Sequence, residues 1–184
     1  MTTVTSRSIL DFWFKDIDPK RWFVSDAAFD ADVKMRFEQA WRDAREGKFA
    51  DWENDKQGTL ALILLFDQFP RNMFRGSADA FATDALARRV AKLALKRGDD
   101  VEAPASVRSF YYLPLMHSED LSDQDSCVRL TRERLGEAHF SFPYALSHRA
   151  AVERFGRFPA RNRALGRDTT PEEAEFLKDH PAGF

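Results

Sequence analysis

The chain has 184 residues, of which 43% are hydrophobic and 32% are charged, and its formal net charge is −2. This length suits one domain with a hydrophobic core, and the composition excludes an intrinsically disordered chain. The single cysteine, Cys127, excludes a disulfide within the chain and a cysteine-based zinc site. We therefore predict one helical domain over residues 1–184.

Export and membrane insertion are not indicated by the sequence. Residues 1–8 lack the basic start and apolar run of a signal peptide. The longest apolar stretch, residues 60–66, is far shorter than the roughly 20 residues that cross a bilayer. Together with the lone cysteine, these features predict a cytoplasmic protein without membrane contacts.

The first predicted helices follow from hydrophobic periodicity, and no segment shows the alternation of a strand. Residues 57–69 are apolar on most sides, which predicts a helix buried all round that ends or bends at Pro70. The clearest amphipathic helix covers residues 26–46 and is followed by Gly47 as a stop. Its apolar stripe consists of Phe29, Val33, Phe37, Ala40, Trp41 and Ala44.

Further helices are predicted downstream. Residues 105–117 are predicted to form a helix with a kink at Pro114. A last helix is predicted to start at Thr170, because this threonine can cap a helix and is followed by proline and glutamates. Others cover residues 80–97, 122–135 and 142–155, and the apolar face of the first of these holds Ala82, Leu86, Val90 and Leu93. The predicted fold class is all-α, with about eight helices packed as antiparallel hairpins.

A polar cluster occupies residues 67–75, at the end of the most buried predicted helix. An unpaired carboxylate here would be costly, so we expect Asp67 to pair with Arg71, four residues further on. A structural ion pair is one interpretation. In the other, Asp67, Arg71, Asn72 and Arg75 bind the carboxylate or phosphate of a ligand through guanidinium and amide groups.

A second cluster, about 90 residues later, is similar in sequence to the first. Residues 66–72 read Phe-Asp-Gln-Phe-Pro-Arg-Asn, and residues 155–162 read Phe-Gly-Arg-Phe-Pro-Ala-Arg-Asn. If the two Phe-Pro turns meet in space, Arg157, Arg161 and Asn162 complete a two-sided clamp with the first cluster. A solvated basic face is the alternative interpretation.

The candidates for proton transfer are His117 and His148. His148 falls on a predicted stripe with Tyr144, and a hydrogen-bonded core histidine is the ordinary interpretation of such a position. The run His-Ser-Glu at residues 117–119 does not form a catalytic triad, because neighbours at a helix end point apart. The spacing of the four histidines matches no zinc or di-iron pattern, and no glycine-rich phosphate loop occurs, so we predict neither metal nor cofactor.

Several phrases of the sequence resemble a known family. They lie at residues 66–76, 80–86, 112–119 and 155–162, and the likeness extends over nearly the whole chain. The chain resembles the bacterial family catalogued as domain of unknown function 924, whose members are similar in fold to tetratricopeptide-type helical arrays. The resemblance implies a tetratricopeptide-like fold and supplies no activity; Ala160 departs from the family, whose members often carry histidine there.

The sequence names no reaction, and it leaves open whether the protein is an enzyme and what its oligomeric state is. We favour binding or turnover of a small anionic metabolite in an interhelical pocket lined by arginine, asparagine and histidine side chains. The alternative is a tetratricopeptide-like module that binds a protein or peptide. The overall charge argues against a nucleic-acid partner.

Overall fold

The computed structural model describes residues 4–180, and 76% of the chain is helical with no strand among the described residues. The predicted all-α fold is confirmed. Twelve α-helices occur among the described residues, more than the eight or so predicted, because several short ones escaped prediction. They are α1 (Ser6–Asp11), α2 (Ala27–Arg45), α3 (Lys56–Ile63), α4 (Phe69–Met73), α5 (Asp84–Arg97), α6 (Asp99–Glu102), α7 (Ala105–Arg108), α8 (Leu113–Met116), α9 (Leu121–Arg134), α10 (Ser141–Phe155), α11 (Asn162–Leu165) and α12 (Pro171–Asp179).

The amphipathic helix α2 forms as its sequence predicts. Asp26 caps it by accepting hydrogen bonds from the backbone N–H groups of Ala28 and Phe29, which lack partners inside the helix. Every residue of the predicted apolar stripe is buried. One of them, Trp41, donates its indole N–H to the hydroxyl of Thr83, 3.1 Å away, and so ties α2 to the start of α5.

The buried helix does not end at Pro70, because helical structure runs on to Met73. A π-helical turn at Leu64–Gln68 joins α3 to α4, with Pro70 in the first turn of α4. Proline offers no N–H to the carbonyl of Phe66, and the Thr83 hydroxyl donates to that oxygen instead at 2.7 Å. Arg71 donates to the carbonyl of Asp67 at 2.7 Å. Side chains thus replace the helical bonds that the wide turn and the proline remove.

Two other expectations need correction. The segment 105–117 is not one kinked helix, because α7, a 3-10 turn at Ser109–Tyr111 and α8 divide it, and Pro114 lies in the first turn of α8. The buried face of α5 is also different from the predicted one. Ala82 precedes α5 and is exposed, Leu86 and Leu93 are half-buried, and only Val90 of the predicted face is buried. The buried apolar residues of α5 are Ala87, Val90, Ala91 and Ala94.

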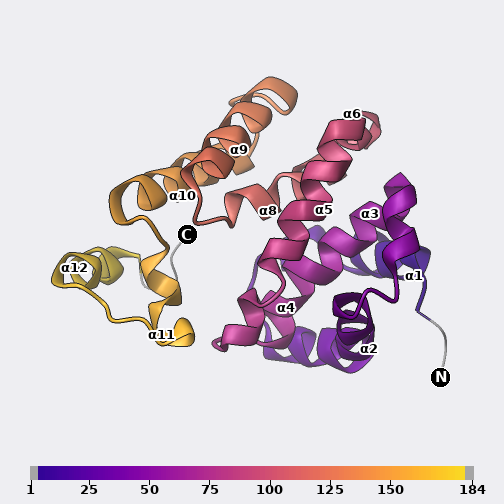
Figure 1. Ribbon diagram of the computed structural model, residues 1–184, viewed down its shortest axis with the longest axis horizontal. Coiled ribbons are helices and arrows are strands. Elements are labelled where there is room, and N and C mark those ends of the chain that lie inside the picture. Colours follow the sequence, from indigo (N-terminus) through magenta and orange to yellow (C-terminus); the bar gives the residue numbers. More distant parts are fainter. Residues whose placement is uncertain (1–3, 181–184) are drawn as a thin grey trace.

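Figure 1 shows α1–α5 gathered in one part of the molecule and α9–α12 in the other, with α8 between them. α9 and α10 form an antiparallel hairpin. The main core contains buried residues from α1 to α10, while Ala151, Val152 and Phe158 form a second, smaller apolar cluster. The single domain and the tetratricopeptide-like arrangement stay predictions. None of the described helices is long and apolar enough to cross a membrane.

Gly58, in the first turn of α3, allows the close approach of the preceding chain. A Cβ atom at this position would lie 2.1 Å from the carbonyl oxygen of Trp52, which is backbone and cannot rotate away. We expect Gly58→Ala to lower the free energy of unfolding by about 2–3 kcal/mol, as overpacking does. Thermal unfolding measures this, with Gln57→Ala at the exposed neighbouring position as the control. Equal midpoints for the two variants would contradict the close contact.

Candidate functional site

A cavity of about 580 Å³ lies between the two parts of the molecule, within the range of small-molecule sites. Its walls come from residues 22–24, the region of α4, α8, the beginning of α10 and residues 158–161. No aspartate or glutamate is among the described residues that line it. The basic side chains that line it are Arg71, Arg75, His117, His148 and Arg161.

The two Phe-Pro turns meet at this cavity, where Arg71 and Arg161 share the carboxylate of Asp84. Arg71 binds it with two nitrogens, at 3.0 and 3.1 Å, and Nη1 of Arg161 lies 3.1 Å from Oδ2. The Asp84 side chain is only 10% exposed and does not line the cavity. The guanidinium groups therefore face the cavity while the carboxylate that balances their charge lies behind them.

Arg161 is held in place by rings and by backbone. Its guanidinium carbon lies 4.6 Å from the ring centres of both Phe81 and Phe158, so the cation is stacked between two aromatic faces. Its Nη2 donates to the carbonyl of His117 at 2.8 Å. Burial, together with the charge of Arg71, lowers the pKa of Arg161 to about 10, which leaves it charged at neutral pH.

Asp67 and His117 form a hydrogen-bonded pair beside the arginines. Nδ1 of His117 lies 2.8 and 3.0 Å from the two carboxylate oxygens of Asp67, which is fully buried. Burial opposes ionisation of Asp67, but Arg71 and His117 outweigh it and hold the pKa of that carboxyl below its usual range. The expected ion pair of Asp67 with Arg71 is present at 3.5 Å.

The wall beside the arginines is fixed by Asp30 of α2. Arg75 binds both carboxylate oxygens of Asp30, at 2.7 and 3.0 Å, and the side-chain amide of Asn72 donates to the same group at 2.7 Å. Arg75 and Asn72 both line the cavity, and Asp30 does not. The same pattern therefore occurs twice: basic or amide groups face the cavity, and their acidic partner lies outside its lining.

His148 lies across from His117, with 6.1 Å between the ring centres. Its Nδ1 donates to the carbonyl of Tyr144 at 2.8 Å, and its ring meets Phe158 edge to face. Burial and the neighbouring His117 lower the pKa of His148 to about 3, so the ring is neutral at pH 7. Tyr144 is exposed, so the predicted buried stripe through His148 is interrupted.

Aromatic side chains form the rim of the cavity. Phe23 and Phe140 are each 56% exposed, and their ring centres lie 6.3 Å apart. Tyr144 also lines the cavity and is 53% exposed. Trp22, also in the lining, is held by a hydrogen bond from its indole N–H to the carbonyl of Trp13. The cavity therefore combines largely buried polar groups such as Arg161 and His117 with exposed aromatic surface.

A family model described as a bacterial protein of unknown function, DUF924, matches residues 9–181. The chain belongs to the DUF924 family. The solved structure of a protein of unknown function from Agrobacterium tumefaciens is 43% identical to it, with a TM-score of 0.89 over 95% of this chain and 97% of that one. No curated protein matches the chain. The resemblance noted in the sequence is therefore confirmed, and it carries no activity.

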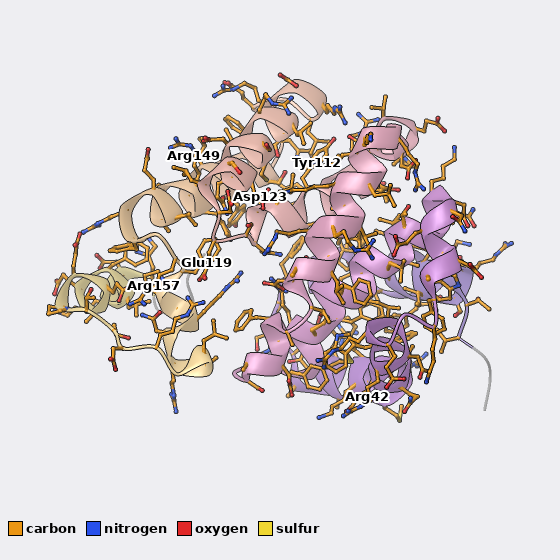
Figure 2. The ribbon with its side chains drawn as sticks, viewed as in Figure 1. Arg42, Tyr112, Glu119, Asp123, Arg149 and Arg157 are labelled. Carbon is orange, nitrogen blue, oxygen red and sulfur yellow. The ribbon has the colours of Figure 1, made fainter. Side chains whose placement is uncertain are left out.

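Two of the predicted ligand-binding residues lie elsewhere in this DUF924 protein. Arg157 binds Glu173 of α12 at 2.6 and 2.9 Å, and Asn162 donates to the same carboxylate at 3.1 Å. Neither residue lines the cavity. Figure 2 places Arg157 beside α12, on the far side of Glu119 from α5. Both residues fasten α12 to the chain before it, because the carboxylate of Glu173 is almost wholly buried.

The remaining predicted residues gather at or behind the cavity of the DUF924 protein. Arg71, Asn72, Arg75, Arg161 and both histidines line it, and Asp67 lies behind His117. Sequence reasoning missed Asp84, whose position in the first turn of a helix made it look like ordinary helix-end chemistry. It also missed the contribution of Gln68, Phe81 and Phe140 to the lining. Among the described residues no group of three potential ligands is placed to hold a metal ion, and the absence of a metal stays a prediction.

Proposed function

We propose that the cavity binds a small organic anion with an apolar body. One observation carries the proposal: three arginines and two histidines line the cavity, and no carboxylate faces it among the described residues. A guanidinium group is a strong partner for a carboxylate or phosphate, because it binds both oxygens of such a group at once. The acidic groups that neutralise the arginines lie outside the lining and do not compete for the ligand's position.

Arg161 offers the most complete anchor for the acidic group. A guanidinium has five N–H donors, and the protein atoms described here accept from Arg161 only at Asp84 and His117. The other donors are available to a ligand. Phe81 and Phe158 fix the plane of the guanidinium, which reduces the entropy lost when a ligand binds.

The aromatic rim supports the second half of the proposal. Phe23, Phe140 and Tyr144 expose large apolar areas at the mouth, where a flat or aliphatic ligand body covers them. A ligand with an acidic head and an apolar body therefore satisfies both the basic side chains and the rim. Benzoate and phenyl phosphate have this shape, and benzamide is a neutral counterpart of benzoate.

The arginine test uses thermal unfolding of the parent and of Arg161→Met with benzoate, phenyl phosphate, inorganic phosphate and benzamide. An acid at about a hundred times its dissociation constant is expected to raise the midpoint of the parent by about 5–10 °C. Benzamide is expected to have no effect, and Arg161→Met to lose the increment whatever its own midpoint.

Arg157→Met is the matched control, because it removes an arginine that binds Glu173 away from the cavity. It is expected to keep the increment that the acids produce. The proposal fails if benzoate and benzamide shift the parent equally, or if Arg157→Met and Arg161→Met lose the increment to the same extent.

Turnover of the ligand and a cytoplasmic location belong to the same proposal, and the presence of a single, buried cysteine supports the location. The tetratricopeptide-like interaction module stays an untested alternative. The exposed aromatic residues that would support it stand at the rim of the cavity, where a small ligand accounts for them equally well.

A further inference from the structure

The pair formed by Asp67 and His117 lies where an acidic ligand would bind. We infer that His117, oriented by Asp67, is the general base of the cavity and takes a proton through Nε2 from the bound ligand or from a water molecule beside it. The inference rests on the proposed function and deepens it, because it names the chemistry that follows binding.

The contacts of the His117 ring show which of its two nitrogens carries the proton. The carboxylate of Asp67 can only accept, so Nδ1 of His117 carries the proton of that hydrogen bond. In the neutral ring the lone pair then lies on Nε2. The His117 ring lines the cavity, and Nε2 has no hydrogen-bond partner among the described residues. A base that meets a ligand needs this tautomer, and a carboxylate behind the ring selects it.

The charge state also suits a base. Burial and the charge of Arg71 lower the pKa of His117, against the opposing effect of Asp67, so the ring is neutral at pH 7. When Nε2 accepts a proton, the imidazolium forms beside an ionised carboxylate that is already in place. The proton returns to the product or to water, and the histidine is restored without any other reactant.

Hydrogen bonds connect the His117–Asp67 pair directly to the arginines of the anion site. Arg161 donates to the backbone carbonyl of His117, and Arg71 donates to the backbone carbonyl of Asp67. Each arginine therefore holds in place one member of the pair as well as facing the ligand. This rigidity fixes the distance between the acidic group and Nε2, which is what proton transfer within a bound complex requires.

His148 is the weaker candidate for the same role. Its Nδ1 faces the carbonyl of Tyr144, which fixes the ring but cannot stabilise an imidazolium as a carboxylate does. Its low pKa of about 3 also makes it a poor proton acceptor at pH 7. The structure thus favours His117 over His148 as the base, a choice that the sequence alone leaves open.

The test is alkylation of the intact protein with iodoacetate and with iodoacetamide at pH 7, followed by mass spectrometry of its peptides. Nε2 displaces iodide from the reagent's methylene carbon, and a carboxymethyl or carbamidomethyl histidine forms. Iodoacetate carries the charge that the arginines attract, and iodoacetamide is its neutral counterpart. The lone Cys127 does not interfere, because it is buried and burial raises the pKa of its thiol to about 12.

We expect iodoacetate to modify Nε2 of His117 at least about tenfold faster than iodoacetamide does, and faster than it modifies N-acetylhistidine. The pH dependence of the rate gives a second readout, because only the neutral form of the ring is nucleophilic at Nε2. The rate at His117 is expected to hold below pH 6.5, where the rate of N-acetylhistidine falls. The charged or titratable groups that face the ring and set this profile are Asp67, Arg71, Asp84, His148 and Arg161.

The outcomes separate the inference from the proposed function. Equal rates for the two reagents at Nε2, both above the rate of N-acetylhistidine, would support the base and remove the anion site. Benzoate stabilisation without any enhanced reaction at His117 would keep the anion site and overturn the base. Reaction at Nδ1 would also overturn it. All these measurements use the parent protein, so none depends on whether a variant of Asp67 folds.

Discussion

Asp84→Ala is expected to lower the free energy of unfolding by about 3–5 kcal/mol, because it leaves two half-buried guanidinium groups close together without their shared, largely buried carboxylate. For a chain of this length the midpoint of thermal unfolding falls by roughly 10–15 °C. Acetate is expected to recover part of this loss, since it can take the position of the missing carboxylate.

The control is Asp79→Ala, which removes an exposed carboxylate that forms no ion pair with the described residues. Its midpoint is expected to stay near that of the parent, and sodium chloride at the same ionic strength separates the effect of acetate from that of salt. Equal midpoints for the two variants, or equal recovery by chloride and acetate, would contradict the bridging role of Asp84.

Asp67→Ala is the second large effect, again about 3–5 kcal/mol, because Arg71, His117 and Gln68 all lose a fully buried partner. Urea unfolding at pH 7 measures it. Asp67→Asn is expected to lose less than Asp67→Ala, since the amide retains a hydrogen bond to its neighbours. Asp51→Asn, at an exposed position, is the control and is expected to leave the free energy unchanged.

The pKa of Asp67 also predicts how the stability of the parent changes with pH. The pKa of Asp67 is lowered in the folded state from an ordinary value of 3.8, so its ionised form stabilises the fold above about pH 4. This contribution is lost as the pH falls below that value. The parent is therefore expected to lose stability more steeply than Asp67→Asn between pH 5 and the onset of acid unfolding, and parallel curves would show that Asp67 is not ionised in the fold.

The helices that could be predicted are those that follow from the hydrophobic periodicity of their own residues. The apolar stripe of α2 repeats along one face of the helix, and all its residues are buried as expected. The passage through Pro70 could not be predicted in this way. The carbonyl that proline leaves free is bound by Thr83, 17 residues further along, and no local rule reports such a partner.

The site shows the same division. Arg71 and Arg161 could be selected because both follow a Phe-Pro turn, and His117 and His148 because they are histidines in apolar surroundings. Arg157 forms an ion pair with Glu173 because α12 folds back against it. The sequence of residues 155–162 gives no information about where α12 lies. The pairing of Asp67 with His117 spans 50 positions and becomes visible only in three dimensions.

The shared carboxylate of Asp84 also bears on how the protein is made. Arg71 and Asp84 are 13 positions apart, whereas Arg161 follows Asp84 by 77 positions. At bacterial rates of synthesis the ribosome adds that stretch in about 4–15 s. During this interval a nascent chain can hold the first two partners but lacks the third, so the polar lining of the cavity is completed only after Arg161 has been added. A chain released early would keep most of the hydrophobic core and have no finished site.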